Sequence, residues 1–157
     1  MKETTRIEIQ LKRALEGEAW HGPSLMELLA EVSAAGANAR PIPNAHTIWE
    51  IVLHVAAWHR AVSRRLEGER VNLSPEEDWP AVTNTGEEAW KQALEALHKS
   101  YQHLHTRLLS LKDSQLDEAP RGSNHSIYVI LHGVIQHDLY HAGQIALLKK
   151  ALSRGKK

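Results

Sequence analysis

The sequence predicts an all-α protein, a four-helix bundle that occupies residues 1–157 as one domain. Three observations lead to this fold class. Apolar residues recur at helical spacing in long segments, and the alternation that is typical of strands is not evident. Stretches with proline, glycine and charged residues separate these segments. The length of 157 residues is also the usual size of one domain.

The N-terminal third is expected to be helical but interrupted. Apolar positions predict a helix over about 5–16, which Gly17 ends. A second helical piece is expected to start at Ser24, because Glu27 follows at the spacing of a capping box. In that motif the two side chains bond to free backbone N–H groups of the first turn. Two prolines within 41–43 then predict an extended connection.

A long helix is predicted next, with clear signals at both ends. Thr47 and Glu50 have capping-box spacing, so Thr47 is the expected N-cap. The helix should run to about Glu67, with Gly68 as its C-cap. Residues 69–84 contain prolines and several charges and are predicted to form a long loop.

Two further helices complete the predicted bundle. Thr85 and Glu88 have capping-box spacing, and apolar positions predict a helix over about 86–111. A loop over about 112–125 should lead to a last helix over about 126–152. The long loop after the 47–67 helix allows a crossover connection, so the spacing leaves crossover and up-down-up-down topologies open.

Composition excludes several functional classes. The chain has no cysteine, so disulfides, thiolate metal sites and a cysteine nucleophile are excluded. Acidic and basic residues number 19 each, whereas a nucleic-acid-binding protein usually has a basic excess. No apolar run approaches the roughly 20 residues that span a bilayer, and the N-terminus lacks the apolar stretch of a signal peptide. We therefore expect a cytoplasmic protein whose partners are neither nucleic acid nor membrane.

Histidine is unusually frequent, at 11 residues. It is the commonest protein ligand for metals and titrates near neutral pH. His137 and His141 are four residues apart, so they should lie one turn apart on one face of the C-terminal helix. The pair alone is weak evidence, because a chain with this many histidines produces about one such spacing by chance.

The positions of three histidines within apolar stripes are stronger evidence for a metal site. His141 lies inside the stripe of the C-terminal helix with His137 beside it, and His54 falls within the stripe of the 47–67 helix. Three imidazoles from two helices could share one divalent transition metal, with a coordination position left for water or substrate. The same positions also suit core histidines that are satisfied by hydrogen bonds, and spacing leaves both interpretations open. The C-terminal stripe consists of Ile127, Leu131, Val134, Asp138, His141, Ile145, Leu148 and Leu152.

The other histidines are not expected to join this site. His132 lies about 140° around the helix from His137, and His59 is offset from His54 by the same five residues. His46 precedes a helix and should be exposed. The remaining histidines are expected on solvated helix surfaces or in loops: His21, His98, His103, His105 and His125.

Two segments resemble the DinB/YfiT-like superfamily. They are HTIWEIVLHVAAW at 46–58 and QHDLYHAGQI at 136–145, and the similarity in length and helix order extends over nearly the whole chain. The resemblance implies a four-helix bundle with up-down-down-up topology, which suits the long loop after the 47–67 helix. It also implies that His54, His137 and His141 bind a divalent metal, commonly nickel or zinc.

The resemblance implies a function as well. Relatives include transferases that use low-molecular-weight thiols, and a metal lowers the pKa of a thiol or water bound to it. We therefore expect a metal-dependent thiol S-transferase that acts on small electrophiles, with a metal-dependent hydrolase and a non-enzymatic metal-binding stress-response bundle as alternatives. No catalytic residue beyond the ligands is assigned. Glu50, Tyr140 and Gln144 are close to the ligands in sequence and are candidates to contact them or to line a pocket.

The C-terminal helix predicts self-association. Ile135, Leu139, Ala142 and Ala146 are apolar residues outside its main stripe, which is more apolar surface than a bundle helix needs. We expect a homodimer with this helix near the interface. The alternative is that the loops and the segment 24–38 cover this face.

Overall fold

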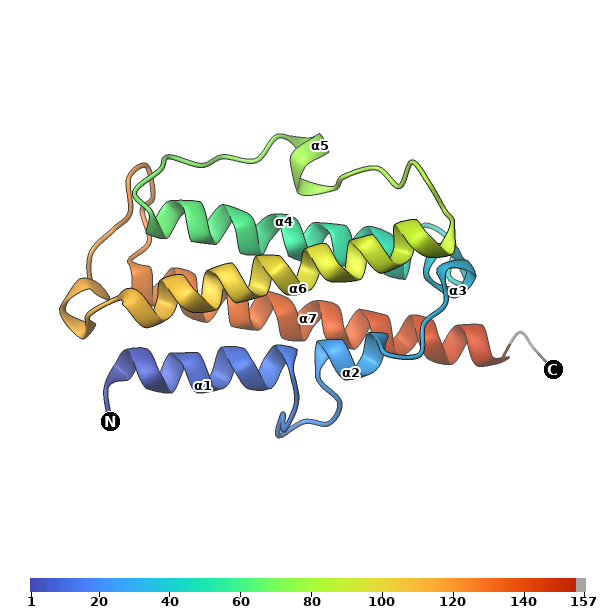
Figure 1. Cartoon of the computed structure of the whole chain (residues 1–157), viewed down its shortest axis with the longest axis horizontal. Helices are drawn as coiled ribbons and strands as arrows, with labels where there is room; N and C mark the ends of the chain where they lie inside the picture. The colour runs from blue at the N-terminus through green and yellow to red at the C-terminus, as the bar shows by residue number, and fades with distance from the viewer. Residues whose placement is uncertain (155–157) are drawn as a thin grey trace.

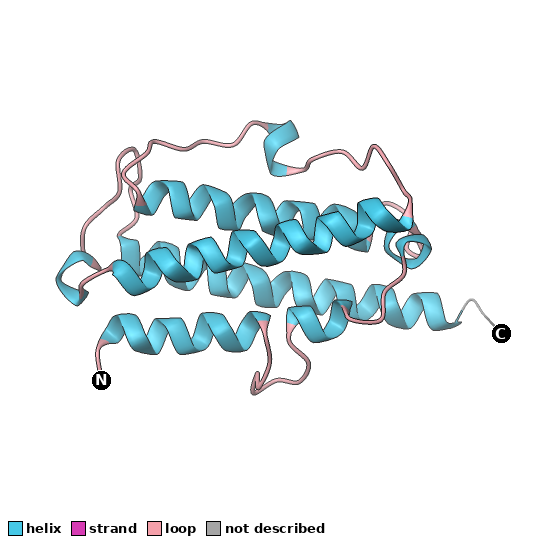
Figure 2. Cartoon of the chain, viewed as in Figure 1, coloured by secondary structure: helices cyan, strands magenta, loops and turns pink. Residues whose placement is uncertain are grey.

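The computed structural model describes residues 1–154, and over this range the chain is all-α (Figures 1 and 2). Within these residues there are no strands. No helix among them is long and apolar enough to cross a membrane. The helices are α1 Glu3–Leu15, α2 Leu25–Leu29, α3 Ala34–Asn38, α4 Ile48–Leu66, α5 Pro75–Asp78, α6 Glu87–Ser110 and α7 Ile127–Arg154, with a 3-10 turn η1 at Asp113–Gln115.

The long helices α1, α4, α6 and α7 lie along the long axis of the molecule (Figure 1). The colour gradient shows that α1 and α7 run in one direction and α4 and α6 in the other. Helix α4 packs against both α6 and α7, while α1 packs against α6 and α7 from the opposite side. Helix α2 lies along α7, and α3 packs against α4 and α6. The contact between α4 and α7 is the one that builds the site described below.

One apolar cluster joins all the long helices. Leu11 of α1, Val55 of α4, Leu104 of α6 and Ile145 of α7 are each fully buried in it. Burial of such side chains is the main stabilising contribution to folding, at about 1.5–3 kcal/mol for each large apolar side chain. The polar histidines of the site are therefore inserted into an otherwise apolar interior.

The predicted capping boxes at Ser24 and Thr47 are confirmed. In both, the N-cap side chain accepts from the backbone N–H of the N3 residue, and the N3 glutamate accepts from the N-cap N–H. At the other end of α4 the C-cap is Glu67 rather than Gly68. Gly68 follows it with φ 89°, the left-handed conformation in which glycine carries no steric penalty. Gly68 therefore takes part in the end of the helix as expected, but it is the residue after the C-cap and not the C-cap itself.

One predicted helix start and one predicted cap differ from the structure. Helix α1 begins at Glu3, earlier than expected, because Asp113 caps it from a distant turn by accepting from the backbone N–H groups of Glu3 and Thr4. Thr85 does not cap α6, whose N-cap is Gly86 without a side-chain hydrogen bond. A remote cap cannot be inferred from local spacing, and capping-box spacing alone does not ensure that the box forms.

The predicted loop over 69–84 contains a short helix. Helix α5 is a single turn, and its N-cap Ser74 forms a capping box with Glu77. It packs against α4. The spacing of Ser74 and Glu77 is a signal that could have located it. Four residues are too few to show helical periodicity, so the apolar pattern gave no indication of this turn.

The apolar residues behind the dimer prediction are largely internal. Helices α1 and α2 pack along α7, and Ile135 and Ala142 are 7% and 2% exposed. Leu139 and Ala146 are half-buried. The large apolar side chains of α7 that do reach the surface are Tyr128, Val129, Tyr140 and Leu147. Because the protein itself covers Ile135 and Ala142 and half-buries Leu139 and Ala146, these residues no longer support a dimer. The dimer stays a prediction.

Candidate metal centre

Three imidazoles converge where α4 crosses α7. His54 comes from the middle of α4, and His137 and His141 lie one turn apart on α7. One ring nitrogen from each lies within 4.8 Å of the other two. His54 and His141 are buried, and His137 is half-buried. The structure thus brings together the three histidines that the sequence singled out, and they could hold a metal ion.

Hydrogen bonds fix the orientation of two of these rings. His54 Nδ1 lies 2.7 Å from the backbone carbonyl oxygen of Asp78, and His141 Nδ1 lies 2.7 Å from Gln144 Oε1. Both partners are acceptors, so each Nδ1 carries the proton and donates. A neutral imidazole protonated at Nδ1 has its lone pair on Nε2. The lone pairs of His54 and His141 are therefore on the nitrogens available to a metal.

The third ring, His137, has a nitrogen without a partner. Its Nε2 lies 2.9 Å from His54 Nε2, whereas its Nδ1 is buried with no hydrogen bond. A proton on Nε2 would satisfy the contact with His54 but leave Nδ1 as a buried acceptor with no donor. A proton on Nδ1 would point toward the carboxylate of Asp138, 3.9 Å away, and leave two Nε2 lone pairs facing each other. A cation between those lone pairs would resolve this conflict, so the donor set fits a divalent transition metal.

Burial favours the neutral form of the imidazoles. It lowers the pKa of His141 to about 4, with a further contribution from the neighbouring His137. Burial also lowers the pKa of His54, although its bond to the Asp78 carbonyl opposes the shift. Only a neutral imidazole can bind a metal. These two rings are therefore ready to coordinate near neutral pH.

The α5 turn covers one side of the histidine cluster. The Trp79 ring stacks between His46 and His54, with centroid distances of 3.6 and 3.8 Å and planes within 8° of parallel. Asp78 contributes twice, since its carbonyl accepts from His54 and its Oδ1 accepts from Trp58 Nε1 at 2.7 Å. The turn that was predicted as loop therefore orients one candidate ligand and two aromatic rings.

The three residues proposed to lie near the ligands have different positions. Gln144 contacts His141, as described above. Tyr140 is 66% exposed, with its ring centroid 5.2 Å from that of His141. Glu50 contacts none of the three imidazoles. Its carboxylate completes the α4 capping box and also pairs with Arg40, and its only link to the cluster runs through His46. Glu50 therefore acts in the cap, and its role beside the ligands or in a pocket stays a prediction.

A buried pair next to the cluster was missed. His59 Nε2 lies 2.9 and 3.1 Å from the two carboxylate oxygens of Asp138, and both side chains are fully buried. Burial alone would raise the pKa of Asp138, but His59 and His137 together hold it below its usual value. Asp138 is the residue after His137 in the chain and the nearest carboxylate to its free Nδ1. The signal in the sequence was a charged residue at a core position of the C-terminal stripe.

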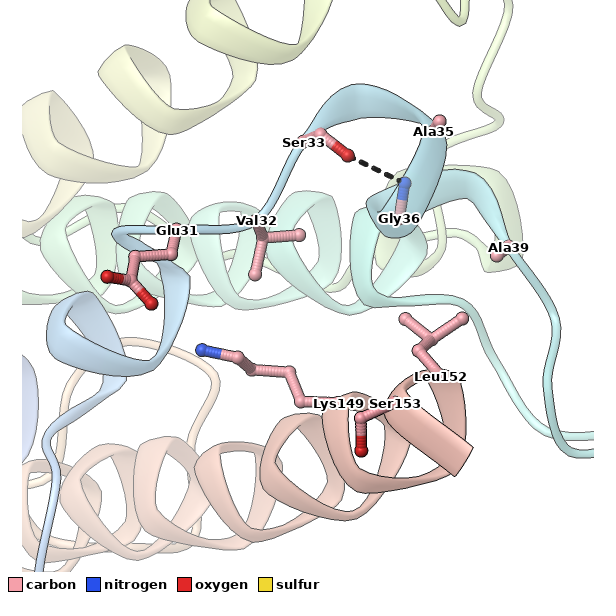
Figure 3. Close-up of a pocket in the computed structure, with 9 residues that line it drawn as sticks. All are labelled: Glu31, Val32, Ser33, Ala35, Gly36, Ala39, Lys149, Leu152 and Ser153. Carbon is pink, nitrogen blue, oxygen red and sulfur yellow. Dashed lines mark hydrogen bonds between the residues drawn. The ribbon is translucent and has the colours of Figure 1, made fainter. Parts of the chain in front are cut away.

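A second hollow lies away from the histidine cluster. It has a volume of about 490 Å³ and is found where the C-terminal part of α7 meets the segment around α3. Figure 3 shows Lys149 reaching across it between Glu31 and Leu152. The Lys149 ammonium donates to the carbonyl of Leu28, so its charge ties α7 to the end of α2. None of the three histidines lines this hollow, and we do not assign the site there.

Comparison with known proteins identifies the family of the chain. A profile of the DinB superfamily matches residues 19–145, which is most of the chain. The chain belongs to the DinB superfamily. It is also similar to a solved structure described as the conserved protein of locus from Enterococcus faecalis, with a TM-score of 0.68 and 21% sequence identity over 96% of this chain and 97% of the other. That similarity supports the fold. No curated protein gave a significant match.

Replacement of Asp138 should show how much its buried pair with His59 contributes to stability. We expect Asp138→Ala to lower the free energy of unfolding by about 3 kcal/mol, because it leaves His59 buried without its partner. The double variant His59→Leu/Asp138→Leu should recover most of this loss, since no polar group is then stranded. Urea unfolding followed by circular dichroism, with a chelator present, measures both.

Glu95→Ala is the matched control for this experiment. Glu95 pairs with Lys99 on the surface, where both side chains are more than half exposed, so its loss should leave the unfolding midpoint nearly unchanged. Equal stabilities for Asp138→Ala and the wild-type chain would contradict the inference that the buried pair is tightly coupled.

Proposed function

We propose that this DinB-superfamily chain is a metal-dependent thiol S-transferase that acts on small electrophiles. Its resident cofactor would be a divalent transition metal, nickel or zinc, held by His54, His137 and His141. The observation that carries the proposal is the convergence of three imidazoles, two of which, His54 and His141, are oriented by Asp78 and Gln144. Three protein ligands leave room for a further ligand, which is typical of catalytic rather than structural metal sites.

The chemistry follows from what such a centre supplies. A bound metal lowers the pKa of a thiol or water that binds to it and so provides a nucleophile at neutral pH. The chain has no cysteine, so the sulfur would come from a low-molecular-weight thiol cosubstrate. In the transfer a sulfur–carbon bond forms, the leaving group departs with its bonding electrons, and the thiol proton passes to solvent. The roles of this chain are to orient the imidazoles through Asp78 and Gln144 and to shield one side with Trp79.

Two other functions share the same centre. A metal-dependent hydrolase would use water in place of the thiol. A non-enzymatic metal-binding bundle would use the site to retain the metal or to signal in a stress response. The half-buried His137 next to a hollow favours an enzyme, because a small molecule can reach the centre from that side.

The proposal includes an architecture and an assembly. We assign the bundle to the up-down-down-up type, with α1, α4, α6 and α7 as its four helices, on the basis of their running directions in Figure 1. We also retain the homodimer, now with the exposed Tyr140 and Leu147 of α7 as its candidate contacts. Neither the transferase nor the metal site requires the dimer.

Metal titration tests the ligand assignment. The metal-free wild-type chain should take up one equivalent of Ni²⁺ or Zn²⁺ by calorimetry and elemental analysis. Alanine at His54, His137 or His141 should weaken binding by about 100-fold or more, since each removes a ligand. Gln144→Ala should weaken it by about tenfold, because the ligand loses only its orienting acceptor. His132→Ala, on the same helix but outside the cluster, is the control and should bind like the wild type.

Thiol dependence of turnover separates the three functions. The metal-loaded chain is mixed with 1-chloro-2,4-dinitrobenzene and a panel of low-molecular-weight thiols. We expect thioether formation with release of one chloride and one proton per turnover, and loss of this activity in a folded His141→Ala variant. Release of the dinitrophenol at the same rate without thiol would favour the hydrolase. No turnover of any electrophile by the fully loaded chain would favour the non-enzymatic bundle.

A further inference from the structure

A hollow of about 370 Å³ opens beside the histidine cluster in the groove between α4 and α7. His137, a member of the cluster, lines it, and so do Trp58 of α4 and Gly133 of α7. Most of the remaining lining is aliphatic. Arg65 is half-buried and His125 is exposed, as are Val129 and Gly133, so cationic and polar groups lie beside aliphatic ones at the mouth of the hollow.

The place of this hollow along the groove makes it an approach to the cluster. Its α4 residues lie between positions 58 and 65, after His54 in the chain. Its α7 residues lie between positions 129 and 137, and end at His137 itself. Because α4 and α7 run in opposite directions, these two sets face each other on the same side of the cluster. A molecule in the hollow would therefore have one end against His137.

Arg65 brings a positive charge to the hollow. Its Nε and Nη2 donate to the carbonyl oxygen of Val71, and within residues 1–154 it takes part in no ion pair. The adjacent Arg64 is paired with Glu69 at 2.8 Å. The Val71 carbonyl occupies the Nε/Nη2 edge of the guanidinium, which leaves the edge formed by Nη1 and Nη2 to pair with a planar carboxylate.

Trp58 gives the hollow a rigid flat wall. Its Nε1 donates to Asp78 Oδ1, which fixes the ring before any ligand arrives. The guanidinium carbon of Arg65 lies 5.5 Å from the centroid of this ring, so the cation and the indole attract each other. The side chain that carries the charge is thereby held next to the apolar wall. A ligand with a flat apolar body and one anionic group matches both features.

Gly133 leaves space on the opposite wall. A Cβ atom built at this position would have no other atom within 4 Å. The helix surface here is therefore open to the hollow. A side chain at position 133 would therefore start from open space and extend beside the hollow.

We propose that this hollow binds the electrophilic substrate, and that the substrate is a planar, mainly apolar molecule with a carboxylate that pairs with Arg65. Its reactive carbon would then lie at the His137 end. The reaction it undergoes rests on the proposed function, but its binding does not require turnover. Low-molecular-weight thiols are polar and flexible, so this apolar hollow suits the electrophile better than the cosubstrate.

Two probes of equal shape test the charge preference. The binding of 2-naphthoate and of neutral 2-naphthamide to the metal-loaded full chain is measured by calorimetry. We expect the wild type to prefer the carboxylate by about fivefold, a modest factor because Arg65 is partly exposed. Arg65→Gln should remove the preference while the affinity for the amide changes less than about twofold. The paired neighbour supplies the control, since Arg64→Gln should keep the preference.

Gly133→Leu tests the location. It should weaken the binding of both probes about tenfold or more, with an unchanged helical signal and unchanged metal content. Gly143→Leu is the matched control, because this glycine is on the same helix, has equal space around it and does not line the hollow. Equal loss of binding in the two leucine variants would overturn the assignment.

The remaining outcomes separate this inference from the proposed function. Failure of both probes to bind the wild type at millimolar concentration overturns the inference, whether or not the chain turns over electrophiles. A carboxylate preference that disappears on metal removal but survives in Arg65→Gln would mean that the carboxylate binds the cation, which also overturns it. Binding with the expected preference, but without thiol-dependent turnover, supports the substrate hollow and contradicts the transferase.

Discussion

The site depends on two acceptors that hold imidazole Nδ1 atoms, the Asp78 carbonyl and the Gln144 side chain. Three histidines in an apolar interior would otherwise be free to turn their nitrogens toward any polar atom within reach. With Nδ1 occupied, the Nε2 lone pairs of His54 and His141 are committed to the space between α4 and α7. A buried polar group without a partner costs about 1–3 kcal/mol, so the two acceptors stabilise the orientations of His54 and His141.

The acceptors come from elements of very different kinds. Gln144 is on the same helix as its histidine, three residues further along, so the α7 helix itself sets their distance. Asp78 is 24 residues from His54 in the chain, and α5 must pack on α4 before its carbonyl can accept. The orientation of His141 is therefore set within α7, whereas that of His54 is set only when α5 packs on α4.

This difference explains what could be predicted from the sequence. The helical period placed His137 and His141 on one face and His54 in the stripe of another helix, and the family resemblance joined the three. The capping boxes at Ser24 and Thr47 were equally readable. The pairing of His59 with Asp138 was not, because it joins residues 79 apart and depends on how α4 and α7 are rotated against each other. The α5 turn was too short for periodicity, although its cap was visible in Ser74 and Glu77.

The two acceptors also differ in how easily mutation can remove them. Gln144 holds His141 through a side-chain oxygen, so a single codon change can delete that bond. His54 is held by a main-chain oxygen, which every amino acid at position 78 would supply as long as the turn keeps its shape. Substitution of Asp78 thus leaves the acceptor for His54 in place. Substitution of a residue that shapes the turn, such as Ser74, can remove it.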